Sequence, residues 1–242
     1  MELAEVVGAL AVLRRFPVRA LGGETPDECL VQGSGLAGDR IYDVYDETQG
    51  SLLGLAEAPF LLRYSARFLD AMVRGADLSA WVRVRTPDGA EAALTDRSWL
   101  EDVARRCGHP VSLRVRTDVA SDPAPLHLLS VPTLRFLEKQ YGGPLEAERL
   151  RSNVLLELPD GRPFEEDHWL GRQLWIGDVL LEIVAGSEHC VLPAVDGGAT
   201  VSERSSGILS AIARGRGGKI GVTARALAGN RMRVGDPVAL VD

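Results

Sequence analysis

The stretch QLWIGDVLLEIV, residues 173–184, decides how the rest of this 242-residue sequence is interpreted. It consists of two apolar runs separated by Gly177-Asp178, and a short glycine-containing dipeptide between two such runs is a signal for a tight hairpin. The stretch therefore predicts two antiparallel strands, at residues 173–176 and 179–184.

Further strands are predicted on both sides of this hairpin. Their expected ranges are 6–18, 28–32, 41–46, 81–85, 92–94, 111–116, 154–158, 221–227 and 237–241. Because strands dominate and do not alternate with helices, the pattern favours a barrel-like fold over a doubly wound one. The predicted class is mainly β with some α (α+β).

Three helices are expected between these strands. Asp96 is predicted to cap a short helix that runs to Cys107, and residues 207–214 form another. Ser130 is the predicted N-cap of a third helix that ends at Gly142-Gly143. The Pro, Asp and Ser content of residues 118–125 indicates an exposed loop. We place a boundary there, between a first segment of residues 1–117 and a second of residues 118–242.

Composition limits the possible partners and the compartment. A net charge of -7 argues against nucleic acid, which is bound through clustered cations. Cys29, Cys107 and Cys190 are widely spaced and odd in number, so neither a disulfide framework nor a zinc knuckle is predicted. The acidic N-terminus does not resemble a signal peptide, and no apolar run approaches the ~20 residues of a membrane helix. These features predict a cytoplasmic protein with no membrane span.

Several polar motifs invite a chemical interpretation. Residues 33–38 match the pattern GxGxxG, but the next residues read as a strand, whereas a dinucleotide phosphate needs a helix N-terminus there. The histidines lack zinc-site spacing. His189 stands beside Cys190, and a nearby cation would favour a reactive thiolate. The alternative for Cys190 is a small buried hydrophobe, the usual fate of a free cysteine.

Two charged segments also have alternative interpretations. Arg149, Arg151 and Asn153 alternate along a predicted strand and would project from one face, where they could grip an anion or simply form a solvated edge. Glu165-Glu166-Asp167 is more typical of a solvated turn than of an acid–base cluster.

Taken in order, the segments resemble the MOSC family, the C-terminal domain of molybdenum-cofactor sulfurases, with its N-terminal β-barrel partner. The motifs that carry the resemblance are RFPVRAL at 15–21, GLAGDR at 35–40, SDPAPLHLLS at 121–130, RLRSNV at 149–154, EDHW at 166–169, IGDV at 176–179, Cys190 with Val195-Asp196, and VGDPV at 234–238. The family's Lys-Ser is Arg19-Ala20 here, its Ser-Arg-Cys is Glu188-His189-Cys190, and the proline before Asn153 is Ser152.

The resemblance implies a molybdopterin-type molybdenum cofactor whose metal is bound by Cys190, a soft ligand. It implies catalytic roles for Cys190, His189 and Asp167. It also implies that the pterin and its phosphate are held by Arg19, Arg40, Pro125, Leu126, Ser130, Arg149, Arg151 and Asn153.

The activity implied is that of the amidoxime-reducing branch, which removes oxygen from N-hydroxylated or related small substrates. The electrons would come from a separate ferredoxin- or cytochrome-like protein, because the chain lacks the cysteine set of an iron–sulfur cluster. One alternative is a non-catalytic carrier of the cofactor or of sulfur on Cys190, and another is a scaffold that has lost the cofactor. The family's association with pyridoxal phosphate would require a Schiff-base lysine, and only Lys139 and Lys219 are present.

Overall fold

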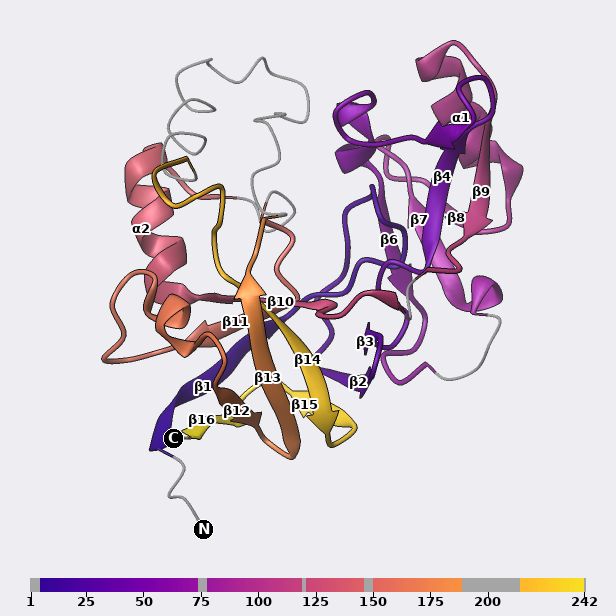
Figure 1. The fold of residues 1–242 in the computed structure, drawn as a ribbon. Helices are drawn as coiled ribbons and strands as arrows, with labels where there is room; N and C mark the ends of the chain where they lie inside the picture. The colour runs from indigo at the N-terminus through magenta and orange to yellow at the C-terminus, as the bar shows by residue number, and fades with distance from the viewer. Residues whose placement is uncertain (1–4, 74–77, 119–120, 146–149, 189–213, 242) are drawn as a thin grey trace.

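The computed structural model describes residues 5–73, 78–118, 121–145, 150–188 and 214–241. The chain forms two lobes, one built around a closed barrel with helix α2 at its side and the other built from small sheets and helix α1 (Figure 1). Most of the described elements are strands, which confirms the predicted α+β class.

The barrel contains seven strands. Their order around it is β1 (Glu5–Leu13), β11 (Val154–Glu157), β10 (Leu126–Ser130), β14 (Val222–Ala228), β13 (Val179–Gly186), β12 (Gln173–Ile176) and β16 (Pro237–Val241). Neighbouring strands are antiparallel except β10 and β11, which are parallel. The predicted hairpin is confirmed, since Ile176 pairs with Val179 across the turn. Its inward side chains, such as Leu174, Leu181 and Ile183, are fully buried in the barrel core.

Three small sheets of three strands each accompany the barrel; the first packs its buried side chains into the barrel core, and the other two form the second lobe. Their orders are β15 (Arg231–Arg233), β2 (Glu28–Gln32), β3 (Gly35–Leu36); β5 (Ser51–Leu52), β4 (Tyr42–Asp46), β9 (Val111–Val115); and β6 (Ser65–Phe68), β7 (Val82–Arg85), β8 (Glu91–Ala93). Helix α1 (Arg97–Cys107) contributes Trp99 and Val103 to the core of this lobe.

Both predicted helix caps are present. The Asp96 carboxylate accepts a hydrogen bond from the Ser98 amide at the start of α1. The Ser130 hydroxyl accepts one from the Thr133 amide at the start of α2 (Val131–Tyr141), which ends where Gly142 takes a left-handed conformation. Short 3₁₀ helices lie at Pro59–Arg63, Ser79–Trp81 and Glu165–Trp169. In the part of the chain that the structure describes, no helix has the length and apolar character needed to span a membrane.

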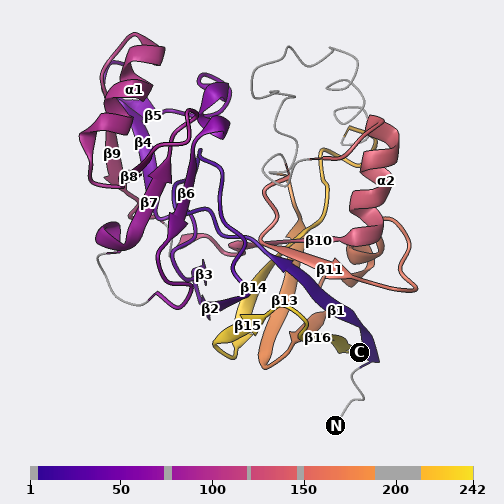
Figure 2. The ribbon, with the colours of Figure 1, turned by 180° about the vertical axis from the view of Figure 1, so that it is seen from behind.

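The barrel lobe contains strands from both sides of the predicted boundary. β1 comes from the first 117 residues, yet it lies between β11 and β16 and completes the barrel (Figure 2). β2, also from the first 117 residues, pairs with β15 from the C-terminal part, and this pair packs into the barrel core through Cys29, Val31 and Met232. Whether the chain divides at residues 117 and 118 as two domains stays a prediction. The barrel lobe therefore cannot be assigned to residues 118–242 alone.

Two sequence expectations need correction. The first strand was expected to reach residue 18 but ends at Leu13, because the chain then leaves the barrel and makes only isolated bridges at Arg15 and Val18. Strand β10 was not predicted, since its residues were taken as the approach to α2; it pairs with β14 and β11, which are distant in sequence. The expected helix at 207–214 lies almost wholly outside the described residues.

Candidate functional site

Three of the predicted site residues, Arg149, His189 and Cys190, lie outside the described residues. The structure does describe the chain just before Cys190. The Ser187 amide donates to the Gly221 carbonyl at 2.9 Å, and the Ile220 amide donates to the Ser187 carbonyl at 3.0 Å. Ser187, the residue that follows the end of β13, is therefore held at the rim of the barrel.

Asn153 lies at the centre of a buried polar cluster where the two lobes meet. Its amide nitrogen donates to Asp39 Oδ2 at 3.0 Å and to the Arg14 carbonyl at 3.2 Å. Its amide oxygen accepts from Arg40 Nη1 at 3.1 Å and from the His127 amide at 3.2 Å. Both donors and both acceptor positions of the amide are used, and the residue is fully buried. Asn153 thus fixes the relative position of chain segments far apart in sequence.

Arg40 is a second residue of this cluster that links distant chain segments, since it bonds to both Asn153 and Arg151. Its guanidinium is ion-paired with Asp39 and donates from Nη2 to the Arg151 carbonyl at 2.8 Å. Its backbone has a φ of 51°, a left-handed conformation uncommon for a residue with a side chain. The Arg40 side chain keeps 20 % of its surface exposed. Its remaining N–H groups, on Nε and Nη2, have no acceptor among the residues that the structure describes.

Arg151 holds the chain around Arg19. Its guanidinium donates to the carbonyls of Arg19 and Leu21 and stacks on the Phe16 ring, with 4.1 Å from Cζ to the ring centroid. The predicted strand alternation through Arg151 and Asn153 is wrong, because Arg151 has a φ of 48° and β11 begins only at Val154. Nor are these residues a solvated edge, since both are buried.

Arg19 presents a partly exposed cation beside this cluster. Its side chain is 37 % exposed, and its Nε lies 3.4 Å from Asp43 Oδ1. Arg116 approaches the other oxygen of Asp43 at 3.7 Å. Burial raises the pKa of the Asp43 carboxyl, an effect that the two arginines oppose. Arg19, Arg40, Arg151 and Asn153 are therefore brought together, as connected parts of one cluster.

Of the three other predicted cofactor residues, Pro125 is half-buried, and Leu126 and Ser130 are buried. Pro125 lies over Gly35, and Leu126 is fully buried in the barrel core. The hydroxyl of Ser130 is also buried, and it donates to Glu166 Oε2 at 2.6 Å. These side chains lie at the barrel rim, where they pack against other residues or make internal hydrogen bonds.

Glu166 was missed by sequence reasoning, which took residues 165–167 as a solvated turn. Its carboxylate is fully buried and accepts hydrogen bonds from the Ser130 amide and hydroxyl and from the Thr133 hydroxyl. The charged run looks like a surface turn because its neighbours in sequence are polar. Only Trp169, an apolar anchor three residues later, indicated that one side of the segment is buried.

Asp167 lies on the outer side of the same 3₁₀ helix. It is ion-paired with Arg216, whose guanidinium stacks on the Phe164 ring at 3.6 Å. Asp167 does not contact the Asn153 cluster through any hydrogen bond or ion pair that the described residues make. It holds the cationic segment 214–219 against the barrel lobe.

The polar cluster fits the anionic part of a pterin cofactor. Arg19 and Arg40 expose guanidinium groups with unused donors, and such groups form charge-assisted bonds to phosphate. The described contacts of Arg151 and Asn153 are to backbone carbonyls and to neighbouring side chains. These two residues therefore position Arg19 and Arg40. Within the described ranges, no three His, Cys, Asp or Glu side chains are arranged to hold a metal ion.

One family model matches the chain. The family model described as the MOSC domain matches residues 116–239. No curated protein matches the chain. Similar solved structures include the YuaD protein of Bacillus subtilis, with 11 % identity and a TM-score of 0.47 over 98 % of this chain and 94 % of that one. They also include YiiM of Geobacillus stearothermophilus, with 19 % identity and a TM-score of 0.34 over 49 % of this chain and 55 % of that one.

Proposed function

Because the chain belongs to the MOSC domain family, which is associated with binding of the molybdenum cofactor, we propose that it binds a molybdopterin-type cofactor and uses it to reduce N-oxygenated small molecules. The observation that carries this proposal is the pair of partly exposed guanidinium groups, Arg19 and Arg40, on one buried hydrogen-bonded cluster.

Arg19 and Arg40 would bind the cofactor phosphate. Arg40 offers N–H groups that no described residue accepts, and Arg19 has only the single described contact to Asp43 on its guanidinium. Arg151 and Asn153 would act as positioning residues, since Arg151 grips the Arg19 carbonyl and Asn153 grips the Arg40 guanidinium. Preorganised donors of this kind bind an anion without having to be ordered first.

The Cys190 thiolate would be the ligand from this chain to the metal, a soft donor suited to such a site. The bound cofactor would supply the redox chemistry that side chains cannot perform. Removal of oxygen from an N-hydroxylated substrate consumes two electrons and two protons and releases water. A separate ferredoxin- or cytochrome-like protein would deliver the electrons. Asp167 and His189 would support the site from nearby.

The decisive experiment is molybdenum and pterin analysis of protein purified from cofactor-competent cells. Wild type should carry both in near-stoichiometric amounts, Cys190→Ser should lose the metal, and Arg40→Gln should lose pterin and metal together. Arg105→Gln on α1, an exposed cation of the other lobe, is the matched control and should retain both. Folding of each variant is checked by its melting temperature.

The same preparations separate the competing functions. Protein that folds but contains neither pterin nor molybdenum in wild type contradicts the oxidoreductase proposal. A persulfide on Cys190 in such protein, detected by mass spectrometry, would identify a sulfur carrier instead. Cofactor-loaded protein that does not oxidise a reduced electron donor in the presence of an N-hydroxylated substrate would identify a cofactor carrier.

A further inference from the structure

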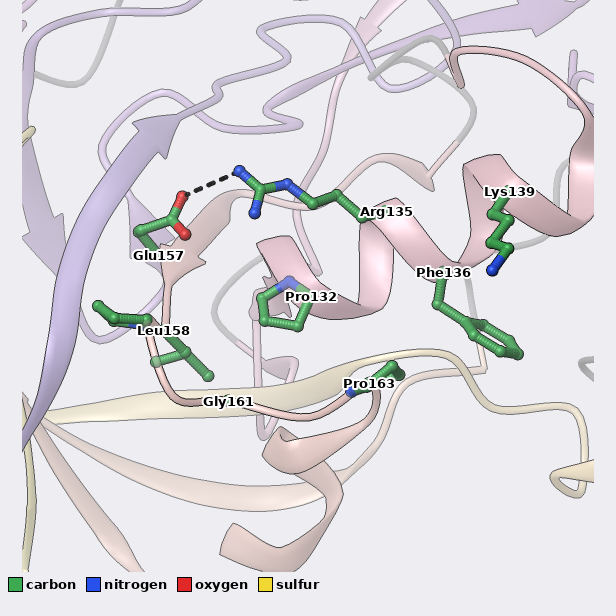
Figure 3. Close-up of a pocket in the computed structure, with 9 residues that line it drawn as sticks. Pro132, Arg135, Phe136, Lys139, Glu157, Leu158, Gly161 and Pro163 are labelled. Carbon is green, nitrogen blue, oxygen red and sulfur yellow. Dashed lines mark ion pairs between the residues drawn. The ribbon is translucent and has the colours of Figure 1, made fainter.

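A groove on the outer side of the barrel lobe lies between α2 and the loop of residues 158–163. It is a depression open to solvent with a volume of about 390 Å³, and small-molecule pockets span roughly 300–1,000 Å³. Figure 3 shows Pro132, Arg135, Phe136 and Lys139 along one side of α2, facing Leu158 and Pro163 of the loop. We refer to this site as the α2 groove.

The helical spacing explains why these side chains share the groove. Positions 132, 135, 136 and 139 follow the i, i+3, i+4, i+7 pattern and therefore lie on one face of α2. The face of α2 that meets the barrel is formed by Thr133 and Leu137, which are fully buried. The groove face adjoins this buried face, and Phe136 takes part in both, since it also packs against the core that contains Leu137.

The walls of the α2 groove are held in place by interactions beneath it. Phe136 packs edge-to-face on Phe164, with 5.3 Å between ring centroids. The Phe164 amide donates to the Thr133 hydroxyl at 2.6 Å, and that hydroxyl donates to the buried Glu166 carboxylate at 3.0 Å. The loop and the helix are therefore fixed to each other before any ligand arrives, which reduces the entropic cost of binding.

The charges at the rim select the kind of ligand. Lys139 has no ion pair in the described part of the chain. Arg135, 70 % exposed, has only a long contact of 3.9 Å to Glu157, and exposed pairs of this kind contribute little. The position of Lys139 in the last turn of α2 is explained in part by the helix dipole, which stabilises a cation there. Arg135 lies in the middle of α2, where the dipole gives no such stabilisation. The groove is therefore lined by two cations and one carboxylate, Glu157, around an apolar floor of Leu158, Pro132 and Phe136, and its charged groups carry a net positive charge.

We propose that the α2 groove binds a small organic anion, a carboxylate attached to an aromatic or branched aliphatic body. The apolar body would lie on Phe136 and Leu158, and the carboxylate would meet Arg135 and Lys139 at the rim. The site is independent of the proposed cofactor, because none of its residues is assigned to that cofactor.

The test is a titration of the purified full chain, followed by amide chemical shifts, with 2-naphthoate and with its neutral counterpart 2-naphthamide. We expect 2-naphthoate to shift amides of α2 and of residues 158–163 and to bind about tenfold more tightly than the amide, because hydrogen bonds to charged groups are the stronger ones. The double variant Arg135→Gln/Lys139→Gln should weaken 2-naphthoate binding about tenfold. It should leave 2-naphthamide unaffected.

Arg105→Gln is the matched control, since Arg105 is a helix-surface arginine with 72 % exposure. It should leave both affinities and the melting temperature unchanged. Equal affinities for the two probes, shifts confined to other surfaces, undiminished binding by the double variant, or no saturation at millimolar concentration would each overturn the proposal.

Discussion

Replacing Asn153 by aspartate tests whether the buried cluster joins the lobes as described. The side chain keeps its shape, so no cavity forms, but the two N–H donors are lost. The new carboxylate oxygen would stand where the amide nitrogen now lies, 3.0 Å from Asp39 Oδ2 and 3.2 Å from the Arg14 carbonyl. Asn153→Asp therefore places two carboxylates in contact at a fully buried position.

The expected loss of stability follows from this distance. Two unit charges 3.0 Å apart repel by about 5 kcal/mol at an effective dielectric constant near 20. The folded protein can avoid the repulsion by binding one proton, which costs about 1.4 kcal/mol for each pH unit above the ordinary aspartate pKa of about 3.9. Proton uptake costs less free energy than the repulsion between the two charges. Asn153→Asp should therefore lower the free energy of unfolding by about 4 kcal/mol at pH 7 and about 1.5 kcal/mol at pH 5. The sign follows because the folded state holds the proton more tightly than the unfolded state, so the penalty grows as pH rises.

Urea unfolding of wild type and variant at pH 5, 6 and 7 measures this difference. The double variant Asn153→Asp/Asp39→Asn exchanges the amide and the carboxylate and should recover part of the loss, since the amide at position 39 can again donate across the 3.0 Å contact. A loss below 1 kcal/mol at pH 7, or a loss that does not change with pH, would refute the described geometry.

Three further predictions concern other buried or paired groups. Burial raises the pKa of the Cys29 thiol from its ordinary 9.0 to about 11, so the unfolded thiol ionises first. Wild type should therefore lose about 2 kcal/mol of stability relative to Cys29→Ala as pH rises from 9 to 11, and a stability difference in urea that does not change with pH would contradict this. Glu166→Gln should lower the free energy of unfolding by about 2 kcal/mol, because the charge-assisted bonds from Ser130 and Thr133 weaken; an unchanged midpoint in urea would show that the carboxylate is not buried as described. Asp167→Asn should cost less than about 1 kcal/mol, since its ion pair is partly exposed, and a large loss on thermal unfolding would assign it a structural role.

The sequence predicted the elements whose signals are local. The hairpin at residues 173–184, the caps Asp96 and Ser130, and the glycine that ends α2 depend on neighbours within a few positions, and the structure confirms them. Strand β10 was missed because its pairing partners lie far away in the sequence. Glu166 was misjudged for the same reason, since its burial depends on α2 covering it.

The sequence by itself determined the fold class, the family resemblance and the residue types available to hold an anion. It did not determine which arginines keep donors for a ligand, because that depends on where each guanidinium finds a carbonyl or carboxylate. The fold brings Arg151 to the carbonyls of Arg19 and Leu21 and leaves Arg19 and Arg40 partly exposed. It also sets α2 against residues 158–163 to form a groove. Contacts between residues more than a hundred positions apart arise only when the barrel closes, so only the tertiary structure could decide them.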